Sequence, residues 1–123
     1  MNKIIIVALT LSAFAPLSAQ AQERMSDARY IAAQQCLAYA DLSQLQADGV
    51  DVAGLRQAVR PGFRETAVAS EARENARRLR ARANNLATTP NGVEELREQR
   101  DAACASFVER GLVQNQSRAT GAS

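Results

Sequence analysis

Apolar side chains recur at steps of three and four residues over most of the chain after residue 22, and no segment alternates apolar and polar residues over the length of a strand. This spacing is typical of helices that turn one face toward a core. The composition agrees, because alanine, arginine, glutamate, glutamine and leucine dominate and favour the helix, whereas β-branched residues are few. We therefore expect an all-α fold with no sheet.

Start and stop signals divide this pattern into helices. The first helix is expected over residues 23–47 and is followed by Gly49, which suits a left-handed cap. Asp51 is expected to cap a short second helix over residues 52–60. Pro61 ends this short helix, because proline disfavours the helical conformation in the residue before it.

The second half of the chain predicts two long helices. The first of them is expected over residues 63–87 and carries alanines that let a neighbouring helix approach closely. Thr89 as N-cap, with Pro90 at the first helical position, predicts the start of the last helix. That helix is expected to run to about residue 110 and to end at Gly111.

Cys36 and Cys104 are the two cysteines of the chain, and each falls near the middle of an expected helix. In an oxidising compartment such a pair predicts a structural disulfide, worth about 4 kcal/mol in the chain-entropy treatment. We therefore predict a small up-and-down bundle of three main helices plus one short helix, stapled by one disulfide. Residues 22–113 are expected to form this single domain, and residues 114–123 a disordered tail.

The first 21 residues have the layout of a cleaved secretory signal peptide. Lys3 supplies a positive start, an apolar run covers residues 4–15, and residues 19–21 (Ala-Gln-Ala) match the small-x-small cleavage rule. The apolar run is shorter than the roughly 20 residues that cross a bilayer. We therefore expect an exported protein of a bacterial periplasm, without stable membrane insertion.

The absence of histidine excludes several kinds of chemistry. Ser-His-Asp triads, Cys-His pairs and imidazole metal ligands all need that residue, and two cysteines alone cannot complete a tetrahedral zinc site. Glu94, Glu98 and Asp101 share a helix face, but the sequence favours ordinary pairs of Arg97 with Glu94 and with Asp101 over a metal site. We expect a non-catalytic protein with no catalytic residue, no metal and no cofactor.

Charge varies along the chain although it nearly cancels overall. Beyond the signal peptide, fourteen arginines face thirteen acidic residues, which argues against binding to nucleic acid. The third expected helix is basic and lies between two acidic helices in sequence. Its arginines form either a solvated helix face, with their stems over the apolar seam and their charged ends paired with those acidic helices, or a patch that binds an anion or an acidic partner. The patch would consist of Arg73, Arg77 and Arg80.

Two apolar residues of the first helix, Tyr30 and Leu37, fall outside the face that is expected to be buried. They form either an exposed apolar interaction patch or a contact with the short second helix. The residues expected to face the core in this helix are Ala28, Ile31, Gln35, Ala38, Leu42 and Leu45, and the residues expected to widen this apolar face are Ala32, Cys36, Tyr39 and Ser43.

Three functions remain as hypotheses. The first is a non-catalytic protein that binds another periplasmic protein, a second copy of itself, or an anionic envelope component. The second is an acid- or stress-responsive periplasmic chaperone, because protonation of the acidic residues would leave the arginines to repel one another. The third is an enzyme, which would have to rely on carboxylates and arginines. In size, export and cysteine pair the chain resembles small exported helical proteins such as acid-stress chaperones and lysozyme inhibitors.

Overall fold

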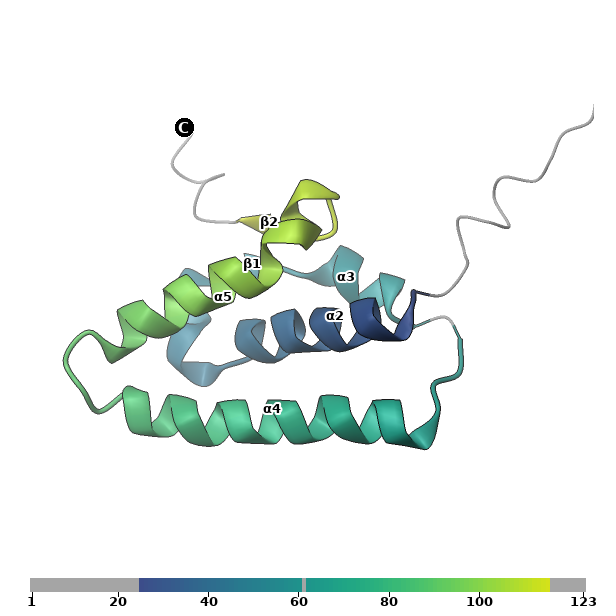
Figure 1. Ribbon diagram of the computed structural model, residues 1–123. Helices are drawn as coiled ribbons and strands as arrows, with labels where there is room; N and C mark the ends of the chain where they lie inside the picture. The colour runs from purple at the N-terminus through teal and green to yellow at the C-terminus, as the bar shows by residue number, and fades with distance from the viewer. Residues whose placement is uncertain (1–24, 61, 116–123) are drawn as a thin grey trace, which may run out of the picture.

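The structure, a computed structural model, describes residues 25–60 and 62–115, and the predicted signal peptide over residues 1–21 lies outside them. The prediction of a small all-α fold is confirmed, with α2 lying between α4 and α5 (Figure 1). α2 and α4 run in the same direction, whereas α5 runs in the opposite one (Figure 1). The elements in chain order are α2 (Asp27–Ala40), the 3₁₀-helix η1 (Ser43–Asp48), β1 (Val50–Asp51), α3 (Ala53–Ala58), α4 (Thr66–Leu86), α5 (Gly92–Glu109) and β2 (Gln114–Asn115).

α2 ends well before residue 47, where the prediction placed its end. Leu42 adopts an extended conformation, and the chain then turns into η1. Gln46 Nε2 donates to the carbonyl oxygens of Ala40 (3.3 Å) and Leu42 (2.8 Å), so it supplies hydrogen bonds where the helix stops. The turn places both Leu42 and Leu45 in the core, with 3% and 1% of their surfaces exposed.

The return from η1 to α3 differs from the prediction at Gly49 but agrees at Asp51. Gly49 has a φ of −64°, so it forms no left-handed cap. Asp51 Oδ1 accepts a hydrogen bond from the backbone N–H of Ala53 at 3.0 Å, so Asp51 bonds the start of α3 as expected, although Val52 takes the N-cap position.

The connection between α4 and α5 is built differently from the prediction. Thr89 is not the N-cap of α5, because its hydroxyl donates to the carbonyl oxygen of Leu86 at 2.8 Å and so closes the end of α4. Asn91 takes the N-cap position, with a φ of 65°. A Cβ atom on Gly92 would lie 1.7 Å from the carbonyl oxygen of Leu86. The two helices therefore meet at a point that only glycine permits.

Gly111 ends α5 as predicted. Its φ is 78°, its N–H donates to the carbonyl oxygen of Val108, and the N–H of Leu112 donates to that of Phe107 at 2.9 Å. These two hydrogen bonds make up a Schellman motif, which reverses the chain after the helix.

The chain beyond this reversal corrects two predictions. Val113 is buried, with 2% of its surface exposed, and Gln114 and Asn115 pair antiparallel with β1. The expectation of no sheet is therefore wrong, and so is the expectation of a disordered tail for these two residues. The rest of that tail, residues 116–123, lies outside the described residues. Burial of Val113 explains the difference, because it draws the following backbone against β1.

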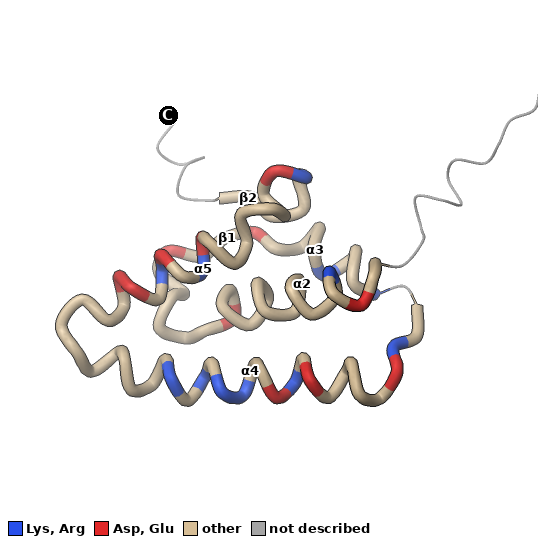
Figure 2. Tube along the Cα trace, viewed as in Figure 1, with Lys and Arg blue, Asp and Glu red and all other residues tan. Residues whose placement is uncertain are grey.

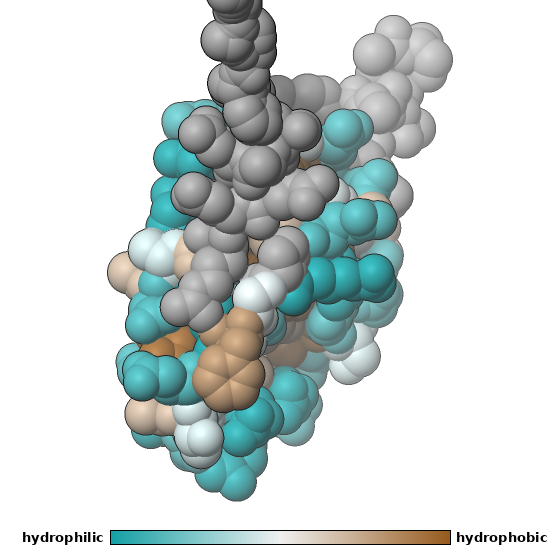
Figure 3. All heavy atoms as spheres, turned by 90° about the vertical axis from the view of Figure 1, so that its right-hand side faces the viewer, coloured by the Kyte–Doolittle hydropathy of each residue, from teal (hydrophilic) through white to brown (hydrophobic). Residues whose placement is uncertain are grey.

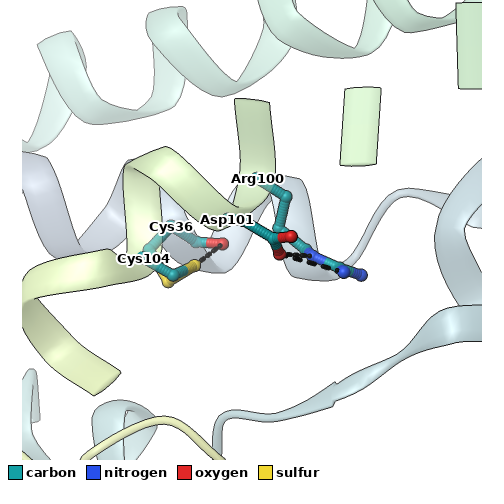
Figure 4. The surroundings of a disulfide bond; sticks show 4 residues. All are labelled: Cys36, Arg100, Asp101 and Cys104. Atoms are coloured by element: carbon teal, nitrogen blue, oxygen red, sulfur yellow. Dashed lines mark hydrogen bonds and ion pairs between the residues drawn. A yellow bond between two sulfur atoms is a disulfide. The ribbon is translucent and has the colours of Figure 1, made fainter. Parts of the chain in front are cut away.

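The predicted disulfide joins the middle of α2 to α5 (Figure 4). The Cα atoms of Cys36 and Cys104 are 4.9 Å apart, and both side chains are buried. One cluster of core residues surrounds this bond and includes Leu55 of α3 and Phe107 of α5. A second cluster lies towards the turn between α4 and α5. Its members are Tyr39, Leu42, Leu45, Leu79, Ala83 and Leu96.

The buried face of α2 is shifted from the predicted one, although it includes Cys36 and Tyr39, which were expected at its edge. Ala28 and Gln35 are exposed, whereas the buried residues of the helix are Ala33, Cys36, Leu37 and Tyr39. Alanine is too small to mark a buried face clearly, so several of the possible helix faces looked similarly apolar in sequence. The disulfide and the two flanking helices decide which face is buried.

Candidate functional site

The surface of α4 is the most basic part of the described molecule. The helix carries five arginines and two glutamates, and Figure 2 shows basic residues along much of its length. The three arginines predicted as a patch, Arg73, Arg77 and Arg80, are all exposed. They lie together around a shallow hollow of about 350 Å³, which Ser70 and Glu74 complete. The structure therefore places these three residues on one accessible surface, here called the arginine face.

Few carboxylates neutralise the arginine face. Glu74 pairs with Arg77 within the same helix. Arg73 Nη2 donates to the neutral hydroxyl of Ser70 at 3.3 Å. Among the residues that the structure describes, neither Arg73 nor Arg80 forms an ion pair.

The arginines of α4 also form no ion pair with the acidic residues of α2 or α5 in the described part of the chain. Arg64, which belongs to the same expected helix (63–87), does pair with Asp27 of α2. The interpretation that the arginines pair with the neighbouring acidic helices is therefore confirmed for Arg64 and wrong for the five arginines of α4. The five arginines of α4 lie on a solvent-exposed helix face.

A cluster of hydrogen-bonded polar side chains joins three helices and was not predicted from the sequence. Arg82 of α4 donates through Nη2 to the hydroxyl of Tyr39 in α2 (2.9 Å) and to Oε1 of Gln99 in α5. The Tyr39 hydroxyl in turn donates to the same Gln99 oxygen at 3.2 Å. Arg78 and Arg82 are four residues apart, which indicates that both lie on one side of α4. Their partners on other helices cannot be predicted from nearby residues in the sequence.

Two arginines of α5 hold the end of η1. Arg97 pairs with Asp48 at 2.7 Å and, as predicted, with Glu94 at 2.5 Å. These hydrogen bonds, the one with Glu94 first, raise the pKa of Arg97 above its ordinary value, so the guanidinium stays charged. Arg100 is buried and donates to the backbone carbonyl oxygen of Asp48 at 2.6 Å. The predicted pair of Arg97 with Asp101 is wrong, since Asp101 pairs with Arg100 (Figure 4).

Tyr30 and Leu37 do not form the exposed apolar patch that was one of the two predictions. Leu37 has 5% of its surface exposed and lies in the same core cluster as Leu55 of α3, which fits the other prediction. The ring of Tyr30 is covered by the guanidinium of Arg64, 4.5 Å from the ring centre, and Arg64 pairs with Asp27. The prediction of an exposed apolar patch is therefore wrong for Leu37, and at Tyr30 the ring is covered by Arg64.

Large apolar side chains are scarce on the described surface. Phe63 and Val108 are the exposed ones there, at 76% and 43%. The end of the molecule in Figure 3 is mostly hydrophilic, with isolated hydrophobic areas. In residues 25–60 and 62–115, no helix is both long and apolar enough to cross a bilayer, and no group of three metal-ligating side chains lies close together.

The fold and its surfaces define a small all-α protein with one buried disulfide and a helix that exposes five arginines, of which Arg73 and Arg80 form no ion pair within the described part of the chain. The chain matches no protein-family model, no curated protein and no solved structure. Its function is therefore inferred from its own surfaces and their chemistry.

Proposed function

We propose that the protein is an exported, non-catalytic binding protein of the bacterial periplasm and that the arginine face of α4 holds an anionic partner. That partner is another periplasmic protein or an anionic component of the envelope. Guanidinium groups suit this role, because their planar N–H donors match the oxygens of carboxylates and phosphates.

The observation that carries the proposal is the lack of neutralisation on the arginine face. Arg73 and Arg80 are exposed and form no ion pair among the described residues, although acidic residues are abundant in α2 and α5. An arginine that serves only to solubilise a helix would gain from such pairs. Here the fold leaves the arginines available to an external anion.

The rigidity of α4 supports the same role. Ala72, Leu79 and Ala83 are buried along its inner face. At its end, the backbone of Leu86 packs closely against Gly92, the first residue of α5. The arginines therefore extend from a fixed backbone. A surface that is held in place before binding loses less conformational freedom when the partner arrives.

Binding to poly-L-glutamate and to vesicles of phosphatidylglycerol tests the proposal. The exported, oxidised protein is compared with Arg73→Gln/Arg80→Gln and with a charge-matched control, Arg60→Gln/Arg110→Gln, whose residues are exposed elsewhere. We expect the first variant to bind about 5- to 30-fold more weakly, from roughly 0.5–1 kcal/mol per exposed contact, and the control to bind nearly as wild type. Equal losses in both variants, or no binding by the wild type, would refute the proposal.

A further inference from the structure

A second hollow, of about 430 Å³, opens between α2 and α4 and shares no lining residue with the arginine face. Its apolar part is formed by the buried side chains of Tyr39 and Leu79, whose residues are 5% and 7% exposed. Its polar part carries two guanidinium groups and two side-chain amides. The complete lining is Gln35, Tyr39, Asn75, Arg78, Leu79 and Arg82. We refer to it as the α2–α4 groove.

Arg82 is held in position at this groove by neutral partners. Its Nη2 atom donates to the Tyr39 hydroxyl and to Gln99, which come from α2 and α5. No carboxylate among the described residues pairs with Arg82. The side chain is therefore oriented by the fold, while its charge is not neutralised.

Arg78 lies one helical turn before Arg82 and is only loosely held. Its contacts with Glu74 and Asn75 are long, at 3.6 Å and 3.5 Å. Two like charges four residues apart on a helix repel each other. An anion bound between the two guanidinium groups would remove that repulsion and would meet several N–H donors at once.

We propose that the α2–α4 groove binds an acidic polypeptide segment, with a carboxylate seated between Arg78 and Arg82. The amides of Gln35 and Asn75 can each donate and accept, which matches the N–H and C=O groups of an extended backbone. The apolar floor of Tyr39 and Leu79 suits a neighbouring aliphatic side chain. A concave, partly apolar site fits such a segment better than the flat surface of a bilayer.

This inference rests on the anionic partner of the proposed function, names the chemistry of that partner, and adds a second contact site beside the arginine face. It differs from that function in assigning recognition to the fork shape of two particular arginines rather than to positive charge alone. Lysine keeps the charge but loses the fork, so Arg→Lys substitutions separate the two ideas.

The test uses fluorescence anisotropy with a labelled octapeptide of alternating glutamate and leucine and the same peptide with glutamine in place of glutamate. We expect the wild-type protein to bind the first peptide and not the second. Arg78→Lys is expected to weaken binding roughly tenfold, the loss of one charge-assisted contact. Arg110→Lys alters an exposed arginine outside both the groove and the arginine face, and it is expected to change binding by less than about twofold.

Arg82→Lys is expected to weaken binding similarly, but it also removes contacts that join three helices. Thermal unfolding of each variant therefore accompanies the titrations. Arg78 has 71% of its side chain exposed, so its substitution leaves the fold intact and keeps the inference open to refutation.

The other outcomes separate the two proposals. If Arg78→Lys weakens binding no more than Arg110→Lys does, the groove is not the site, and the proposed function is decided by its own variant, Arg73→Gln/Arg80→Gln. If the protein binds phosphatidylglycerol vesicles but neither peptide, the partner is a membrane and the inference is overturned. If the wild-type protein binds none of these anionic probes, both proposals are refuted.

Discussion

Removal of the disulfide is expected to cost the protein a large part of its stability. Cys36 and Cys104 are 68 residues apart in sequence, so the bond closes most of the described chain into one loop. The chain-entropy treatment gives about 4.4 kcal/mol at 25 °C for a loop of that length. A small domain is usually stable by 5–15 kcal/mol, so the cross-link supplies a substantial share.

Urea unfolding of the double variant Cys36→Ala/Cys104→Ala measures this loss. Alanine is chosen because a serine hydroxyl at either position would be buried among apolar residues, which adds a separate cost. We expect the free energy of unfolding to fall by about 4 kcal/mol, with a further loss from the deleted sulfur atoms. The slope of the transition is also expected to rise, because an unfolded chain without the cross-link exposes more surface.

A reduced wild-type sample provides the control for side-chain volume. It keeps both sulfur atoms but lacks the bond, so it is expected to lie between the oxidised protein and the double variant. A loss below about 1 kcal/mol in the reduced sample would contradict the reasoning. It would mean that the unfolded chain is held compact by something other than this bond.

Four other substitutions test separate features of the fold. Gly92→Ala is expected to lower the melting temperature by more than about 10 °C in thermal unfolding, because the added Cβ collides with the Leu86 carbonyl oxygen. Gly111→Ala meets no such neighbour, so it is expected to cost only about 1–2 kcal/mol for its positive φ in urea unfolding. Arg100→Ala is expected to cost about 2–3 kcal/mol in the same assay, because it removes a buried hydrogen bond to η1 together with the packing of its stem. Tyr39→Phe is expected to cost about 1 kcal/mol, and a double-mutant cycle with Arg82→Gln should show coupling between the two residues. Little loss for Gly92→Ala, or no coupling in the cycle, would show that the corresponding contact is not formed as described.

The features that sequence predicted correctly are those set by local chemistry or by composition. Gly111 ends its helix because a left-handed residue is needed there, and glycine adopts that conformation without strain. Asp51 accepts a hydrogen bond from the first residue of α3, two residues away. The disulfide followed from the presence of two cysteines on helix faces. Each of these needs little knowledge of the rest of the fold.

The incorrect predictions concern residues whose role is decided by distant parts of the chain. Thr89 has the chemistry of an N-cap, but the close approach of α4 and α5 at Gly92 turns its hydroxyl back to the preceding helix. The end of α2 depends on the burial of Leu42 and Leu45 against α4 and α5. Neither the hydrogen bond of the Thr89 hydroxyl nor the end of α2 can be predicted from residues that are close in sequence.

The candidate sites show the same division. The arginine face was predicted because Arg73, Arg77 and Arg80 follow the period of a single helix. The α2–α4 groove was not predicted, because its orienting contacts join Arg82 to Tyr39 and Gln99 on two other helices. A site assembled across helices needs the packing of the bundle to be known first.

The covalent bridge between α2 and α5 also changes what happens when the backbone is cut. Phe63, between α3 and α4, is exposed and lies inside the loop that the bridge closes. A protease that hydrolyses a peptide bond there leaves two fragments that stay attached through sulfur and remain packed against each other. On a denaturing gel without reductant, the cut molecule would migrate as one species, and it would separate into two fragments once a reductant is added.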